Sequence, residues 1–167
     1  GTGSKFVYVF DRSGSMDEPF GPDTRWNVVR DALFSAADGL VTQLADTTRF
    51  GLSAYTSLDG YMGGVCPMLN STAIELGNAS AIEKMFSGIS PLLNGDTPTG
   101  EALDLAIDAL LADSSPGPRY LILITDGLPD TCDVPDPQNG QPEALAAAAR
   151  AFENGIQTFV VGVSDDI

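Results

Sequence analysis

The chain has 167 residues, of which 43% are hydrophobic, and its 23 acidic and 8 basic residues give a formal charge of −15 at pH 7. This length and apolar content suit one domain with a substantial core, and no apolar run approaches the roughly 20 residues that cross a bilayer, so we expect no membrane insertion by this segment. The acidic charge argues against nucleic acid as a partner, because phosphate backbones bind clustered Lys and Arg, and the absence of histidine removes the usual zinc ligand and the usual general base.

Residues 1–4 are interpreted as a linker or an expression remnant, and residues 5–167 as one domain. A short apolar run without alternation, residues 5–10, predicts a strand that is covered on both faces of a parallel sheet. Apolar residues then recur at helical spacing over residues 26–44, which predicts one long amphipathic helix. Residues 50–55 alternate between apolar and polar, and therefore predict a second strand that is more exposed on one face.

The second half of the chain continues the alternation of strands and helices. Residues 57–78 are rich in Gly, Ser and Asn and predict a loop, with one edge strand near residues 73–76. Ser80 and Glu83 have the spacing of a capping box, which predicts a short helix to about Phe86. The remaining elements are predicted as helices with apolar positions over 102–111 and over 142–154, and as strands over 120–124 and 157–163. This alternation is typical of a parallel α/β sheet.

Asp11, Ser13 and Ser15 follow the first predicted strand at every second position. Side chains alternate along extended backbone, so these three oxygen-bearing side chains can converge on one point, and Gly14 leaves room for the chain to turn. Oxygen ligands suit hard cations such as magnesium, manganese or calcium. The pattern therefore predicts a metal site at the end of this strand.

Two further segments are predicted to complete the same site. Asp126 follows the predicted strand 120–124 within two positions, and Thr97 precedes a predicted helix. Ligands of open α/β sheets bind beyond the carboxyl ends of the strands, where the strand order reverses, so both side chains are expected at the rim that carries Asp11. Taken singly, each has a plain structural alternative: Ser13 and Ser15 as turn residues, Thr97 as a helix cap, and Asp126 in a tight turn.

The chain resembles the von Willebrand factor type A domain in three motifs and in their order: Asp11-x-Ser13-x-Ser15, then Thr97 in GDTPTGEAL, then Asp126 in ITDG. The resemblance spans nearly the whole chain. It implies a Rossmann-like, doubly wound, mostly parallel sheet flanked by helices, with these five residues as a metal-ion-dependent adhesion site. Thr99 is the competing ligand, and Thr97 is preferred because the family's pattern places the ligand first in this Thr-x-Thr pair. A usual member adds a further helix and strand after the position of residues 164–167, so the resemblance also implies a truncated C-terminal end.

The resemblance further implies how the site works. In the family the two serines bind the ion directly, the threonine binds it directly or through water, and the aspartates often bind it through water. If the direct protein ligands are neutral hydroxyls, the ion keeps most of its charge and can attract an external carboxylate. The expected cofactor is one divalent cation, magnesium before manganese or calcium, and the expected partner is a protein that presents Asp or Glu.

Other acidic residues have weaker claims to an ion. Asp17 and Glu18 are interpreted as a solvated turn rather than a second regulatory site. Asp130, Asp133 and Asp136 have the charge density of a calcium loop, but they lack the glycine and the terminal glutamate of an EF-hand at the required spacing.

Two cysteines, Cys66 and Cys132, lie in segments rich in turn residues. An unpaired structural cysteine is usually buried in the core, so we expect these two to form a disulfide. A disulfide indicates an oxidising compartment and hence an extracellular or cell-surface location, whereas free thiols would favour the cytosol.

The favoured function is a divalent-metal-dependent protein-binding or adhesion module, without enzymatic activity. One alternative is an intracellular assembly component that partners an AAA-type ATPase in a chelatase-like complex. Another is a magnesium-dependent phosphohydrolase, but such enzymes typically have a second aspartate where this chain has Ser13, and no general base is evident.

Overall fold

The computed structural model describes residues 3–164; the expectations for residues 1–2 and 165–167, at the linker and at the C-terminal end, lie outside them. Within the described residues, five strands form one sheet in the order β5-β4-β1-β6-β7, and all neighbouring pairs are parallel except β4 with β5. The strands are β1 (Lys5–Asp11), β4 (Arg49–Leu58), β5 (Val65–Ser71), β6 (Arg119–Thr125) and β7 (Ile156–Gly162). The predicted α/β fold with a mostly parallel sheet is confirmed.

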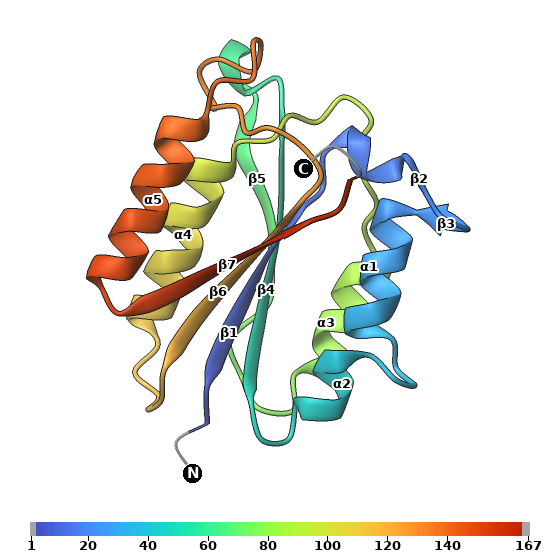
Figure 1. Cartoon of the computed structure of the whole chain (residues 1–167), viewed down its shortest axis with the longest axis vertical. Coiled ribbons are helices and arrows are strands. Elements are labelled where there is room, and N and C mark those ends of the chain that lie inside the picture. The colour runs from blue at the N-terminus through green and yellow to red at the C-terminus, as the bar shows by residue number, and fades with distance from the viewer. Residues whose placement is uncertain (1–2, 165–167) are drawn as a thin grey trace.

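Helices cover both faces of this sheet (Figure 1). One face carries α1 (Arg25–Phe34), α2 (Leu40–Leu44) and α3 (Ala79–Ser87), and the other carries α4 (Thr99–Ala112) and α5 (Gln141–Glu153). The chain runs from β1 to β4 on one side and later places β6 on the other side of β1, so the strand order reverses at β1. The carboxyl end of β1 is therefore the expected ligand-binding position of an open α/β sheet.

The side chains of β1 alternate between two separate cores. Tyr8 and Phe10 belong to a largely aromatic core under α1 and α3, where the rings of Trp26 and Phe86 stack 4.3 Å apart. Val7 and Val9 point to the opposite, mainly aliphatic core under α4 and α5. Burial on both faces explains why this strand is an unbroken apolar run. It also leaves the end of β1 with little freedom to move.

The long helix predicted over residues 26–44 is wrong, because the chain forms two shorter helices, α1 and α2. Ser35 lies between them: its Oγ donates to Asp38 and accepts from the backbone of Ala37, and its carbonyl accepts from Thr42. Such local side-chain bonds compete with helical hydrogen bonding. The apolar spacing continues across the break, which is why periodicity alone missed it.

Three predictions around β4 are also wrong. β4 is buried on both faces rather than exposed on one, because it lies inside the sheet between β1 and β5. The edge strand is β5, not residues 73–76, of which Glu75 forms an isolated bridge to Phe50. The capping box is not formed, since α3 begins at Ala79 with Asn78 as the cap residue, and the Asn78 amide donates to the carbonyls of Phe50 and Ala73.

None of the helices among residues 3–164 is long and apolar enough to cross a membrane.

Candidate metal centre

Asp11 is the last residue of β1 and is fully buried. Its Oδ1 accepts a hydrogen bond of 2.8 Å from the backbone N–H of Ser13, and its Oδ2 accepts one of 2.7 Å from the hydroxyl of Thr125 at the end of β6. Both carboxylate oxygens are thus held by the protein. This carboxylate is oriented before any ligand arrives.

The two serines and Asp126 form a continuous set of hydrogen bonds beside Asp11. The hydroxyls of Ser13 and Ser15 lie 3.1 Å apart, and Ser15 Oγ donates to Asp126 Oδ1 over 2.8 Å. The backbone reaches this arrangement through the 3-10 turn η1 (Gly14–Asp17) rather than through further extended chain. Gly14 is required here, since a Cβ would lie 2.5 Å from the carbonyl oxygen of Leu93.

Thr97 enters the same region from the loop before α4. It lines a cavity of about 330 Å³ together with Ser13 and Ser15. Thr99, the competing threonine, lines a different cavity, which Asp126 also lines, and its hydroxyl pairs with the hydroxyl of Tyr55 at 2.9 Å. The structure therefore brings Thr97 and the two serines to one cavity and turns Thr99 toward the sheet.

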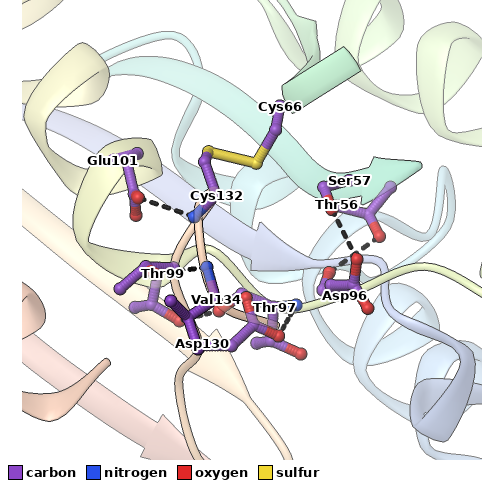
Figure 2. Close-up of a disulfide and its surroundings, with 11 residues drawn as sticks. Thr56, Ser57, Cys66, Asp96, Thr97, Thr99, Glu101, Asp130, Cys132 and Val134 are labelled. Atoms are coloured by element: carbon purple, nitrogen blue, oxygen red, sulfur yellow. Dashed lines mark hydrogen bonds between the residues drawn. A yellow bond between two sulfur atoms is a disulfide. The ribbon is translucent and has the colours of Figure 1, made fainter. Parts of the chain in front are cut away.

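Asp130 fixes the backbone of Thr97, a role that the sequence did not reveal. Thr97 N–H donates to Asp130 Oδ2 over 2.7 Å, and Thr97 carbonyl accepts from Asp130 N–H over 3.0 Å. Figure 2 shows the Asp130 carboxylate directed at this backbone. Asp130 Oδ1 is buried and has no hydrogen-bond partner among the described residues. Asp130 therefore positions the threonine, while one of its own oxygens stays unsatisfied.

Two carboxylates at the site are costly to ionise in the metal-free chain. Burial raises the pKa of Asp11 to about 6, although hydrogen bonds from Ser13 and Thr125 oppose this shift. Burial also raises the pKa of Asp130 to about 7, opposed by the Thr97 N–H and reinforced by nearby Asp96. A nearby cation would stabilise the ionised forms. A cation bound nearby would therefore lower the pKa of both carboxyl groups.

We expect magnesium affinity to fall about tenfold between pH 7.5 and pH 5, because protonation of Asp11 competes with the ion once the pH drops below its pKa of about 6. Calorimetric titration at several pH values measures this directly. A magnesium affinity that is independent of pH over this range would contradict the prediction, because it would mean that Asp11 is already ionised at pH 5 in the metal-free chain.

The predicted disulfide is present and joins Cys66 to Cys132, with their Cα atoms 5.5 Å apart. Cys66 lies in β5 rather than in a loop, and Cys132 lies in the loop after β6 (Figure 2). The backbone N–H of Cys132 donates to Glu101 Oε1 over 2.8 Å. The loop that carries Asp130 is therefore tied both to the edge strand and to α4.

Arg25, at the start of α1, is a further residue of the site that the sequence analysis missed. Its Nη1 lies 2.7 Å from Asp126 Oδ2 and 3.0 Å from Glu18 Oε2. A basic residue soon after the Asp11 motif, in a chain with only 8 basic residues, was the available signal. Asp17 and Glu18 are exposed, as expected of a solvated turn.

Among residues 3–164, no group of three or more Asp, Glu or Cys side chains is gathered in the manner of a metal site. Asp130, Asp133 and Asp136 are likewise not gathered there. The candidate centre at Asp11 differs in kind, because three of its five predicted ligands are hydroxyls. Such a donor set suits a hard cation that keeps water in its coordination shell.

Comparison with known proteins gives a family match and several structural neighbours. The sequence matches the von Willebrand factor type A domain over residues 6–167. The fold resembles the pilus adhesin SpaC of Lactobacillus rhamnosus GG, with a TM-score of 0.69 and 22% identity over 96% of this chain and 24% of the adhesin. It also resembles an aerotolerance-related membrane protein of Bacteroides fragilis, with a TM-score of 0.62 and 23% identity over 96% of this chain and 67% of that one.

A third neighbour is proximal thread matrix protein 1 of the mussel byssus, with a TM-score of 0.60 and 16% identity over 96% of this chain and 37% of that protein. The chain thus spans about a quarter of the pilus adhesin and less than half of the byssus protein. No curated protein matches the sequence. At these identities the neighbours establish a shared fold.

Proposed function

Because the chain belongs to the von Willebrand factor type A domain family, we propose that it is a divalent-metal-dependent protein-binding module. Its ion captures an acidic side chain of a partner protein. The residues that hold the ion are Asp11, Ser13, Ser15, Thr97 and Asp126. Magnesium is the preferred ion, and manganese and calcium are the alternatives.

One observation carries this proposal. Ser13, Ser15 and Thr97 line a single open cavity, although Thr97 lies far from the serines in sequence. Asp126 is hydrogen-bonded to Ser15, and Asp11 holds the backbone of Ser13. Hydroxyls at a cavity, each hydrogen-bonded to or held by a neighbouring carboxylate, suit an ion that stays accessible to an external ligand.

The hydrogen bonds of the two aspartates hold their carboxylates in place and leave a lone pair on each oxygen, so both can act on the ion through water. Asp11 uses both oxygens to accept from the protein, and Asp126 accepts from Ser15 and Arg25. Neutral hydroxyls then provide the direct protein contacts, and the ion keeps its power to attract an acidic partner. The charge of −15 repels acidic partners at long range, so capture takes place at short range.

The disulfide supports a location outside the cytosol, at the cell surface or secreted, because such bonds persist in oxidising compartments. It argues against the alternative of a cytosolic component of a chelatase-like complex. The resemblance to a pilus adhesin agrees with a role in adhesion. We further propose that the domain is not an enzyme, since the second aspartate of a phosphohydrolase is replaced by Ser13 and no general base is evident.

The proposal is tested by calorimetric titration of chelator-treated protein with magnesium and with manganese. We expect saturable one-site binding that is lost when Ser13→Ala and Ser15→Ala are combined, because the ion then lacks two direct ligands. Absence of binding by the wild type would remove the metal from the proposed function and leave only a protein-binding fold.

The chain offers a matched control for the serine substitutions. Ser53 and Ser71 are a second pair of facing hydroxyls, 3.0 Å apart, between β4 and β5. Ser53→Ala combined with Ser71→Ala removes the same atoms without touching the cavity lining. This control is expected to bind magnesium as the wild type does, and an equal loss in both double variants would indicate a general effect on folding.

A further inference from the structure

Arg25 places a fixed positive charge at the edge of the candidate metal centre. Its Nη1 donates to Asp126 Oδ2 over 2.7 Å and to the carbonyl of Ser15 over 3.3 Å. It also forms an ion pair of 3.0 Å with Glu18. The Arg25 side chain is only 16% exposed and that of Asp126 only 1%. This contact is therefore a built-in part of the site rather than a mobile surface pair.

The positive charge of Arg25 beside a metal site is unexpected on electrostatic grounds. The guanidinium repels a bound metal ion and so does not itself stabilise it. The contact does determine what Asp126 can do. Asp126 Oδ1 accepts from Ser15, and Oδ2 accepts from Arg25. Each oxygen keeps a second lone pair, but the charge-assisted bond from Arg25 fixes the orientation of the Asp126 carboxylate and offsets part of its negative charge, and both effects disfavour its direct contact with an ion.

Resting on the proposed function, we propose that Arg25 is a positioning residue that keeps Asp126 out of direct contact with the ion. The arrangement lowers the affinity of the site for the ion and raises the affinity of the bound ion for a partner's carboxylate. A carboxylate bound directly would neutralise part of the ion's charge, whereas one held by Arg25 leaves this charge free for the partner. Arg25 thereby sets how acidic ligands are captured.

This role predicts opposite changes in two affinities when the charge is removed. Arg25→Gln is expected to bind magnesium about three- to tenfold more tightly, because a nearby repelling charge is lost and Asp126 is free to bind the ion. The magnesium-loaded variant is expected to bind acetate, used as the simplest carboxylate probe, several-fold more weakly. Calorimetry measures the first affinity, and nuclear magnetic resonance titration the second.

A spectroscopic count of water provides an independent readout. With manganese in the site, water-proton relaxation reports how many water molecules remain on the ion. Arg25→Gln is expected to lose about one such water, since Asp126 replaces it. A residue that only stabilised the fold would leave this count unchanged.

The matched control is Arg30→Gln, which removes the same charge from the same helix, where Arg30 pairs with Asp31 on the surface. It should behave as the wild type in all three measurements. The inference is overturned if Arg25→Gln matches Arg30→Gln, or if magnesium and acetate affinity fall together. If Arg25→Gln does not fold, Arg25→Met replaces it, because it also removes the charge and keeps an apolar stem; the same changes are expected, and wild-type values would overturn the inference. Failure of the wild type to bind magnesium would instead overturn the proposed function itself.

Discussion

Asp11→Asn is expected to weaken magnesium binding by about 100-fold while leaving the metal-free domain at least as stable as the wild type. Residues that orient the direct ligands of a metal typically contribute 10- to 100-fold to its affinity, and Asp11 also contributes a negative charge. Asparagine has the same shape and can still accept from the Ser13 N–H, while the Thr125 hydroxyl can turn to accept from the new amide. The substitution therefore removes the charge and keeps the geometry.

The effect on stability follows from the raised pKa of Asp11. In the unfolded chain this carboxyl loses its proton near pH 4, but in the folded metal-free chain it does so near pH 6. Between these values the folded state binds more protons, so the free energy of unfolding of the wild type falls as the pH rises through this window. Asparagine lacks this dependence. In chelator, the stability of Asp11→Asn relative to the wild type should thus increase from pH 4 to pH 6 and stay constant above.

Calorimetry with magnesium, and thermal unfolding in chelator at pH 4.5 and pH 7.5, measure the two effects separately. Asp133→Asn is a suitable control, because it removes one acidic charge from an exposed loop position. A grossly unfolded Asp11→Asn would contradict the prediction and assign Asp11 to the fold rather than to the ion.

The strands and the hydroxyl-rich motif were predictable for different physical reasons. β1 and β6 are buried on both faces and therefore form unbroken apolar runs in the sequence. Their carboxyl ends meet at one rim by the geometry of parallel strands, so the proximity of Asp11 and Asp126 followed from topology. The two carboxylates that meet there could thus be located from topology, whereas Ser13 and Ser15 reach the rim through the 3-10 turn η1 rather than through the extended backbone expected of them.

The errors lie where tertiary contacts override local pattern. The predicted helix over residues 26–44 breaks at Ser35, because local side-chain bonds replace helical ones there. β5 pairs only on one side, and Pro67, Asn70 and Ser71 interrupt its apolar residues, so it has neither an unbroken apolar run nor a regular alternation. Arg25 and Asp130 reach the site from separate segments, and their roles depend on distances that no spacing in the sequence encodes.

Removing the disulfide is expected to have the largest effect on stability. The Cys66–Cys132 bridge spans 66 residues of sequence, and the chain-entropy account gives about 4 kcal/mol of unfolding free energy for a loop of this length. For a domain of this size, such a loss lowers the unfolding midpoint by roughly 10 °C. Cys66→Ser combined with Cys132→Ser should show this shift in thermal unfolding, and the reduced wild type should show a shift of similar size.

The same substitution is expected to weaken metal binding at temperatures where the protein remains folded. Cys132 anchors the loop that carries Asp130, and Asp130 holds the backbone of Thr97 by two hydrogen bonds. Without the bridge, this loop keeps the bond from Cys132 N–H to Glu101 but loses its covalent tie to β5. Thr97 is then held less firmly, and part of the binding free energy is used to order it.

The stability of the fold and the order of the site can be separated by a second variant. Glu101→Gln weakens the anchor of the same loop on α4 without opening the covalent loop, so it should reduce magnesium affinity with little change in the unfolding midpoint. If the double cysteine variant loses stability but binds magnesium as the wild type does at low temperature, the bridge acts on the unfolded chain alone. If magnesium affinity falls in both variants, the loop after β6 controls the position of Thr97. Both the disulfide and Glu101 hold this loop, and the loop contacts Thr97 through Asp130.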